Sequence, residues 1–183
     1  PFDLRRQGIN LSEGAAFLCL EARSDRPLAL IGGAGFSTDG HHMTGPHPEG
    51  QGIYRAMQMA LRESGLSADD IDWVHAHGTG SSQNDVVESR ALNRVFTAGA
   101  GPWVSSTKAV HGHALGASGA IESVLVVQAL LHQTVLSTLG LQEPDPECRV
   151  RLVRETTRAP IRHLLKNTLG FGGNNAALIF SRA

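Results

Sequence analysis

The sequence is short of cysteine and of net charge, and it has no long apolar run. Its two cysteines, Cys19 and Cys148, are not spaced as a metal or redox motif, so we expect no disulfide framework and a cytoplasmic location. A formal net charge of -1 gives no electrostatic basis for binding nucleic acid or an anionic membrane. The most apolar stretch, residues 124–131, is shorter than the roughly 18 residues that span a bilayer. No signal peptide or lipidation motif is visible, so we expect neither a nucleic-acid nor a membrane partner.

The apolar residues that are present follow strand-like and helix-like patterns in alternation. At 183 residues with 41% hydrophobic residues, the chain is long enough for one domain with a core. The alternation predicts an α/β layered domain. Helices are expected at residues 49–64, 83–96 and 114–133, and strands at 15–20, 28–35, 71–76, 103–106, 151–153, 163–169 and 175–180. Small residues in the first turns of the 114–133 helix permit close packing, so we expect this helix to lie buried at the centre of the molecule.

Two histidines in glycine-rich contexts are the strongest functional candidates. His77 precedes Gly78-Thr79-Gly80, and His113 precedes the small residues that open the 114–133 helix. Free N–H groups at that helix start favour a neutral imidazole or a nearby anion. A neutral imidazole with one N–H is a good hydrogen-bond donor to a carbonyl that becomes an enolate. Because residues 167–173 form a third glycine-rich loop, we expect one site assembled from distant parts of the chain.

A metal site is the alternative interpretation of the same histidines. His75 and His77, like His111 and His113, have the i, i+2 spacing that places two rings on one face, and four imidazoles are able to hold zinc. We favour this interpretation less, because no carboxylate or cysteine is spaced to complete a typical ligand set. No metal or cofactor site is therefore predicted.

Two charged residues stand in apolar or small-residue surroundings. Lys108 lies in a small, otherwise uncharged loop, which suggests partial burial and a role in anchoring a carboxylate or tuning a histidine. Glu122 lies one turn into an apolar helix, where a lone carboxylate needs a cation or hydrogen-bond donors. A pairing of Lys108 with Glu122 would satisfy both groups.

Four segments, in this order along the chain, carry a resemblance to one enzyme family. They are Pro1-Phe2-Asp3 with Arg6, Gly8 and Glu13-Gly14-Ala15; His77-Gly78-Thr79-Gly80 with Asp85 and Glu88; Ser105-Ser106-Thr107-Lys108 with Gly112-His113 and Gly116-Ala117-Ser118-Gly119-Ala120; and Asn167 with Gly170-Phe171-Gly172-Gly173-Asn174-Asn175. On these residues the chain resembles the C-terminal half of a β-ketoacyl-acyl carrier protein synthase, a condensing enzyme of the thiolase superfamily. A plain thiolase shares the pattern from Gly112 to Gly119, but its final glycine loop carries a cysteine, whereas this loop has Phe171.

The resemblance implies a layered thiolase-like fold and a decarboxylative Claisen condensation of an acyl thioester with malonyl-acyl carrier protein, in fatty-acid or polyketide chain elongation. Residues 1–183 would form the C-terminal thiolase-like domain of a ketosynthase. His77 and His113 would donate hydrogen bonds to the malonyl thioester oxygen, with Lys108, Glu122 and Thr79 in support. The Phe171 backbone N–H would join an oxyanion hole, and its ring would gate the acyl pocket.

The nucleophilic cysteine of the family is expected on an N-terminal half that this chain lacks. Cys19 lies in an apolar run and Cys148 in a loop, and neither has the strand-to-helix context that lowers a thiol pKa. The chain alone is therefore not expected to condense anything. Its expected partners are an N-terminal half or subunit, an acyl carrier protein, and a second protomer in a homodimer or heterodimer.

A non-catalytic role is the alternative function. Some condensing-enzyme heterodimers contain an inactive partner or chain-length-setting subunit that lacks the cysteine and often the histidines, whereas both histidine motifs are intact here. The departures from the family pattern are expected to affect substrate preference rather than the core chemistry; they are Ser12, His75, Asn84, His111 and Asn174.

Overall fold

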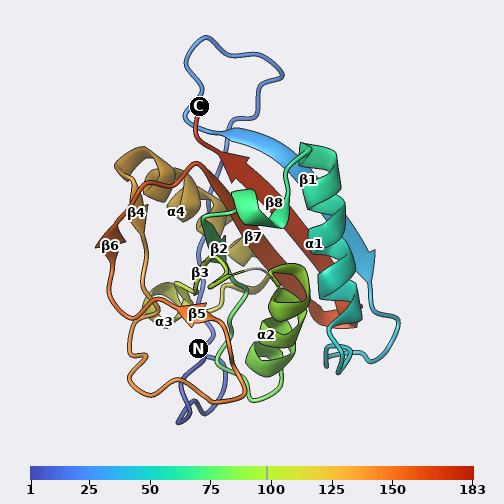
Figure 1. Cartoon of the computed structure of the whole chain (residues 1–183). Helices are drawn as coiled ribbons and strands as arrows, with labels where there is room; N and C mark the ends of the chain where they lie inside the picture. Colours follow the sequence, from blue (N-terminus) through green and yellow to red (C-terminus); the bar gives the residue numbers. More distant parts are fainter. Residues whose placement is uncertain (98) are drawn as a thin grey trace.

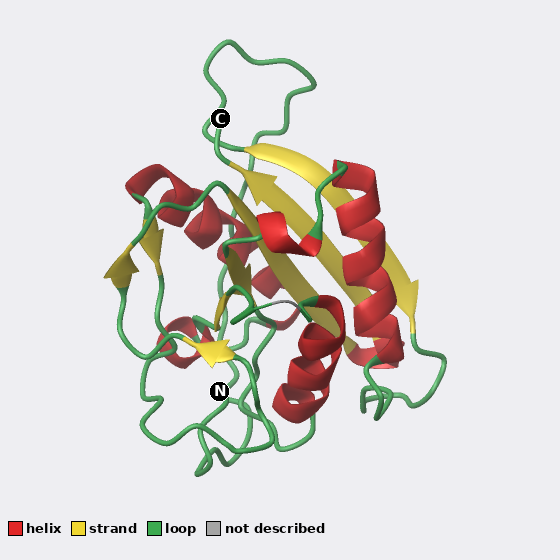
Figure 2. Ribbon diagram, viewed as in Figure 1, coloured by secondary structure: helices red, strands yellow, loops and turns green. Residues whose placement is uncertain are grey.

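A six-stranded mixed sheet lies at the centre of the fold in a computed structural model that describes residues 1–97 and 99–183. Its strand order is β1-β8-β7-β2-β3-β5, and a two-stranded sheet of β4 and β6 lies apart from it (Figures 1 and 2). The strands of the large sheet are β1 Leu30–Thr38, β2 Trp73–His75, β3 Trp103–Ser105, β5 Arg151–Leu152, β7 His163–Gly170 and β8 Asn174–Ser181. The small sheet pairs β4 Thr134–Val135 with β6 Thr157–Arg158 in antiparallel fashion.

Helices cover both faces of the large sheet. The α-helices are α1 Gln51–Ser64, α2 Asn84–Val95, α3 Lys108–His111 and α4 Ser118–His132, and the short 3-10 turns are η1 Ala68–Asp70, η2 Leu115–Ala117 and η3 Phe171–Gly173. Side chains that alternate along a strand point to opposite faces. Leu165 and Ile179 accordingly pack with α1 and α2, whereas their neighbours Leu164 and Phe180 pack with α4 (Figure 1). This arrangement confirms the predicted α/β layered architecture.

Two glycines on β1 let α1 lie close to the sheet. A Cβ atom added to Gly35 would lie 1.9 Å from the carbonyl oxygen of Ala56, and one added to Gly33 would lie 2.2 Å from that of Ala60. Both distances are far inside van der Waals contact, so only glycine fits at these positions while the helix stays where it is. The close approach brings Ile53, Met57 and Leu61 of α1 into the core.

Most predicted elements are confirmed with small shifts at their ends. The 49–64 and 83–96 helices correspond to α1 and α2, and six of the expected strands correspond to β1, β2, β3, β5, β7 and β8. Helix α3 and strands β4 and β6 were not predicted. The expected strand at residues 15–20 is wrong: the segment has no strand partner in the described part of the chain, and Phe17 and Leu20 are 94% and 73% exposed.

The predicted 114–133 helix forms as η2 followed by α4, but it is not buried on all sides. One face carries Glu122, Val126, Ala129 and Leu130 against the sheet, while Leu131 is 46% exposed and apolar side chains such as Val124 and Leu125 are only half-buried. Central burial is therefore wrong for this chain taken by itself.

The same helix also corrects the expectation that no apolar segment has the length of a membrane span. Residues Leu115–His132 form an 18-residue helical window with a mean hydropathy of 1.4, and 33% of it is buried. Its length and composition alone would suit a bilayer. The ion-paired carboxylate of Glu122 and the packing of Leu130 against Leu164 instead fit a helix of the domain core.

Candidate functional site

The site forms at one edge of the large sheet. Strand β2 is parallel to both β3 and β7, so the carboxyl ends of all three strands meet at that edge. The loop after β2 carries His77, the loop after β3 carries Lys108 and leads to His113, and β7 carries Lys166 and Asn167. Segments far apart in the sequence are thereby brought together, as predicted.

Two carboxylates from α2 fix the loop that carries His77. Glu88 accepts hydrogen bonds from the backbone N–H groups of His77 and Gly78, at 2.8 and 2.9 Å, and from the amide of Asn167 at 3.1 Å. Asp85 accepts from the N–H groups of Thr79 and Gly80, both at 3.1 Å. Burial raises the pKa of Glu88, although these donors oppose the rise.

Gly78 is required in this loop for two reasons. Its φ is +38°, and an added Cβ would lie 2.5 Å from the Cβ of Ser106. The loop after β2 therefore lies directly against the loop after β3. The hydroxyl of Ser106 donates to the carbonyl of Gly78 at 2.8 Å and ties the two loops together.

Lys108 sets the tautomer of His77. Its ammonium donates to the His77 backbone oxygen at 2.7 Å and lies 3.4 Å from Nδ1 of the ring. An ammonium has donors and no acceptor, so the Nδ1 that faces it is the unprotonated nitrogen. The proton of the neutral His77 ring is therefore on Nε2.

His113 has the same tautomer for a different reason. Its Nδ1 accepts the backbone N–H of Leu115 at 3.2 Å and lies 2.9 Å from the hydroxyl of Ser118 at the start of α4. A backbone N–H is only a donor, so Nδ1 of His113 is unprotonated and Nε2 carries the proton. Sequence reasoning missed Ser118, since a serine among other small residues gives no signal by itself.

The rings of His77 and His113 converge. Their centroids are 5.2 Å apart and their planes are inclined by 83°. Burial lowers the pKa of both imidazoles, and the Lys108 ammonium lowers both further. The two rings are therefore neutral at pH 7, and each has a single N–H group. The two rings therefore lie together, as predicted, but of the two only His113 lines the cavity beside the site.

A buried ion-pair cluster lies behind the histidines. Lys108 pairs with Oε1 of Glu122, as predicted, and Lys166 pairs with Oε2 of the same carboxylate at 2.9 Å. Burial opposes ionisation of Glu122, but the ammoniums of Lys166 and Lys108 lower its pKa to about 2. Sequence reasoning missed Lys166; the available signal was a lone lysine directly after Leu164 and Leu165 in a segment predicted to be a strand.

The remaining two histidines of the i, i+2 pairs make a separate bridge. The Thr107 hydroxyl lies 2.9 Å from Nε2 of His75 and 2.9 Å from Nε2 of His111. Burial lowers the pKa of His75 to about 3, so this ring is neutral. Within residues 1–97 and 99–183, no group of three or more His, Cys, Asp or Glu side chains converges as a metal site. The zinc alternative has no geometric support.

A cavity of about 430 Å³ opens beside the site. Thr79, Lys108 and His113 line it together with Arg5, Arg6 and other residues of the first ten. The backbone of residues 10–12 pairs with His113, whose N–H donates to the Asn10 carbonyl at 2.8 Å. Four of the predicted site residues, His77, His113, Lys108 and Glu122, thus form one connected cluster, and Thr79 lies at its rim.

Phe171 does not join this cluster in the described part of the chain. It lies in η3 between β7 and β8 and is 66% exposed. The Gly172 N–H donates to the Met43 carbonyl at 2.6 Å, which ties the turn to the loop after β1. The structure therefore places Phe171 on a different loop of the molecule, and its expected gating role stays a prediction.

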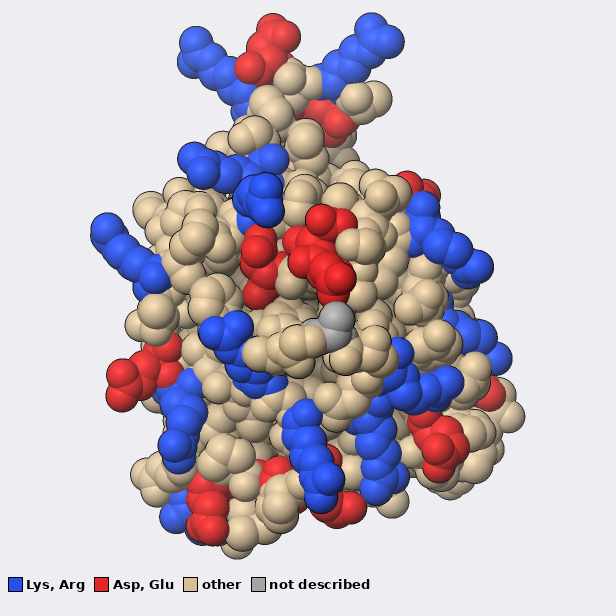
Figure 3. Space-filling model, viewed as in Figure 1, with Lys and Arg blue, Asp and Glu red and all other residues tan. Residues whose placement is uncertain are grey.

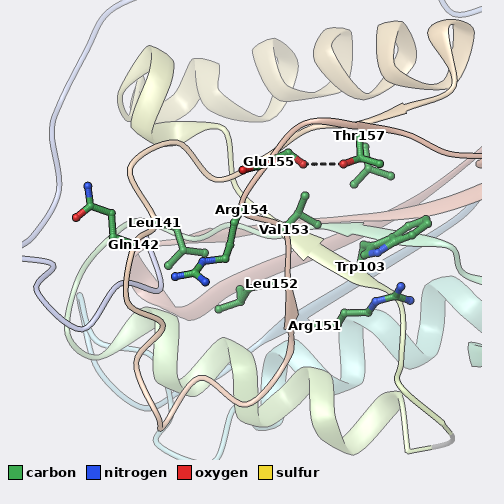
Figure 4. A pocket seen from close by; sticks show the side chains of 10 residues that line it. Trp103, Leu141, Gln142, Arg151, Leu152, Val153, Arg154, Glu155 and Thr157 are labelled. Carbon is green, nitrogen blue, oxygen red and sulfur yellow. Dashed lines mark hydrogen bonds between the residues drawn. The ribbon is translucent and has the colours of Figure 1, made fainter.

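A second cavity, of about 660 Å³, lies beside β5, the outermost strand of the large sheet next to β3. Trp103, Arg151 and Arg154 line it (Figure 4), and the Arg151 guanidinium lies 4.5 Å from the centre of the Trp103 ring. None of the predicted site residues lines this cavity. The charged side chains on the face visible in Figure 3 are of both signs and interspersed.

Neither cysteine is placed as a nucleophile. Cys19 is exposed in the unpaired segment before β1, and Cys148 is buried. Burial raises the pKa of Cys148 to about 11, which keeps its thiol protonated. Neither cysteine belongs to the cluster of His77, His113, Lys108 and Glu122.

Comparisons with known proteins identify the family of this chain. Residues 28–142 match the family model described as the β-ketoacyl synthase C-terminal domain. A 3-oxoacyl-[acyl-carrier-protein] synthase 2 of Synechocystis sp. is 40% identical over 190 residues, which cover 100% of this chain and 46% of that protein. The chain spans about half the length of the curated relatives it matches.

Two solved structures show the fold. The ishigamide ketosynthase/chain length factor matches with a TM-score of 0.94 at 36% identity, over 100% of this chain and 46% of that chain. A type II polyketide synthase acyl carrier protein in complex with its ketosynthase matches with a TM-score of 0.82 at 32% identity, over 85% of this chain and 39% of that chain. The thiolase-like fold is therefore shared, and the chain belongs to the β-ketoacyl synthase C-terminal domain family as the C-terminal half of a ketosynthase.

Proposed function

We propose that this chain, joined to an N-terminal half or subunit that carries the nucleophilic cysteine, catalyses a decarboxylative Claisen condensation. The substrates would be an acyl thioester and malonyl-acyl carrier protein, in fatty-acid or polyketide chain elongation. One observation carries the proposal: His77 and His113 lie with ring centroids 5.2 Å apart, and both have Nδ1 turned to a donor. Each ring then offers its Nε2–H to a substrate.

The two N–H groups suit the charge that develops during decarboxylation. When the bond between the malonyl Cα and its carboxylate breaks, carbon dioxide leaves and the electron pair forms an enolate on the thioester oxygen. Hydrogen-bond donors fixed beside that oxygen stabilise the negatively charged enolate more than the neutral thioester carbonyl of the substrate. The enolate carbon then attacks the acyl group held on the cysteine, and the cysteine leaves as a thiolate.

The supporting residues act on the two rings. Lys108 holds Nδ1 of His77 unprotonated, and Glu122 holds Lys108 in place. Thr79, fixed through its backbone by Asp85, lines the cavity that we assign to the malonyl group. We also assign the Phe171 N–H to an oxyanion hole for the acyl thioester and its ring to the gate of the acyl pocket. Closure of the site would then require the Phe171 turn to approach the cluster.

The assembly we propose contains an N-terminal ketosynthase half, an acyl carrier protein, and a second protomer in a homodimer or heterodimer. The solved relative in complex with an acyl carrier protein and the relative named as a ketosynthase/chain length factor support partners of these kinds. We propose a cytoplasmic location, no cofactor, and no nucleic-acid or membrane partner. The exposed apolar face of α4 is assigned to contact with the N-terminal half.

Substitution of the histidines tests the function. In the assembled protein, His77→Ala and His113→Ala should each reduce malonyl decarboxylation about 100-fold or more, the usual cost of removing one oxyanion donor. His132→Ala, an exposed histidine at the end of α4, is the control and should leave the rate unchanged. Near-normal decarboxylation by His77→Ala would show that the assignment is wrong.

A non-catalytic subunit is the second candidate. The observation that favours it is the name of two matched structures, each of which includes a chain length factor. The coding sequence immediately upstream separates the two candidates. A cysteine at a strand-to-helix elbow there supports the enzyme, whereas glutamine or another residue in its place supports the non-catalytic subunit.

A further inference from the structure

Glu122 is shared by two buried ammonium groups. Lys108 reaches Oε1 from α3, and Lys166 reaches Oε2 from β7 at 2.9 Å. Each ammonium has three acceptors around it. Lys108 donates to Glu122 and lies against two atoms of His77. Lys166 donates to the Asn167 carbonyl at 3.2 Å and to the Thr168 hydroxyl, and its contact with Oε2 of Glu122 is an ion pair without hydrogen-bond geometry. Both side chains are thus held in fixed positions.

Lys108 and Lys166 are the only lysines in the 183-residue sequence, and all its other basic residues are arginines. Lys108 is 4% exposed and Lys166 is 1% exposed. A cation inside a protein is costly unless it is paired. With one carboxylate between two ammoniums, the three groups together carry one net positive charge.

Lys166 also lies beside the histidine bridge. In the sheet, Lys166 of β7 is paired in register with His75 of β2, so the two side chains lie on the same face of neighbouring strands. The charged and titratable groups around Lys166 are Glu122 from α4, Lys108 from α3, Glu88 from α2 and His75 from β2.

We propose that Lys166 is a positioning residue for His77: it holds one oxygen of Glu122 so that the other stays on Lys108, whose ammonium fixes the Nε2–H tautomer of His77. Without Lys166, Glu122 is free to turn both oxygens to Lys108 and to draw its ammonium away from His77. The extra positive charge also favours a negative charge that develops in the site. This inference rests on the proposed function for its catalytic consequence, but not for its effect on the His77 ring.

The direction of the charge effects supports this role. Burial is the largest cause that lowers the pKa of His77. The Lys108 ammonium is the next largest, and Lys166 lowers this pKa as well. Lys166 is also the largest contributor that lowers the pKa of Glu122. Removal of the Lys166 charge should therefore raise the pKa of both groups.

The test replaces Lys166 in the chain assembled with its N-terminal half. Lys166→Met removes the charge, Lys166→Gln removes the charge but keeps a donor for Thr168, and Lys166→Arg keeps the charge. Arg90→Met is the control, since it removes one exposed cation that pairs with Glu147. Long-range 1H–15N spectra of labelled histidine report which ring nitrogen of His77 carries the proton, between pH 4 and pH 8.

We expect Lys166→Met and Lys166→Gln to raise the pKa of His77 and to give a mixture of its tautomers, whereas Lys166→Arg and Arg90→Met keep the original tautomer. Malonyl decarboxylation should show a kcat about 10-fold lower for the neutral variants, the scale typical of groups that orient a reacting side chain, with KM little changed. If Lys166→Met does not fold, Lys166→Gln decides.

Two results would overturn the inference: an unchanged His77 tautomer and pKa in the neutral variants, or a kcat that stays at the original value in them. Absence of decarboxylation in the unsubstituted assembly would instead contradict the proposed function. The histidine spectra would still test the positioning role in that case.

Discussion

The Glu122 carboxylate links the stability of the protein to pH. Its folded pKa, lowered to about 2 by the two ammoniums, lies below the ordinary value of 4.5. Because the pKa of Glu122 is lower in the folded than in the unfolded chain, its ionised form stabilises the fold at pH values above the unfolded pKa. That stabilisation is lost as the pH falls from about 5 toward 2. This contribution is on the order of 3 kcal/mol.

Substitution of Glu122 tests this contribution. Glu122→Gln should flatten the fall in the free energy of unfolding between pH 5 and pH 2, and should lower it at pH 7 by about 3–5 kcal/mol because two buried ammoniums lose their partner. Urea unfolding of the assembled protein across this pH range measures both effects. Glu155→Gln, at an exposed glutamate, is the control. A variant as stable as the original at pH 7 would contradict the ion-pair geometry.

At the scale of elements, the contact between α1 and β1 depends on the missing side chain of Gly35. Gly35→Ala should force the helix away from the strand, because the new Cβ would lie 1.9 Å from the Ala56 oxygen. We expect a loss of about 1–3 kcal/mol or more in the free energy of unfolding, as for other overpacked cores.

Gly32→Ala provides the matched control on the same strand. Its added Cβ would meet nothing closer than 3.7 Å, so the free energy of unfolding should change little. Both variants are compared by urea unfolding in the assembled protein. Equal stability of the two variants would show that α1 tolerates a wider separation than the structure has.

The elements were largely predictable from the sequence because their apolar periodicity is local. Helices α1 and α2 bury the faces that their spacing indicates, and His77 and His113 meet because their loops follow neighbouring parallel strands. The partner of Lys166 was not predictable, since Glu122 is 44 residues away in sequence and only the fold brings the two together. The expected strand at residues 15–20 failed because periodicity indicates an extended apolar segment but does not provide the strand it pairs with.

At the scale of the whole molecule, several large apolar side chains are exposed, and exposed apolar patches mark interaction sites or aggregation liabilities. Phe17, Leu20 and Met43 are exposed, and so are parts of α4. We expect the isolated chain to aggregate or bind hydrophobic dyes, and the complex with its N-terminal half to do neither. Sedimentation and dye fluorescence with and without that half measure this. A soluble, cooperatively unfolding monomer would contradict the proposed assembly.

The burial of Lys108 and Lys166 has a consequence for chemical labelling. Reagents that acylate primary amines require an exposed, deprotonated lysine, and the folded chain offers no such side chain because its surface cations are arginines. Acylation should therefore proceed at the rate at which the sheet edge around Glu122 opens. Since the ammoniums enter from different elements, β7 and α3, the relative modification of the two lysines would report which side of the site opens first.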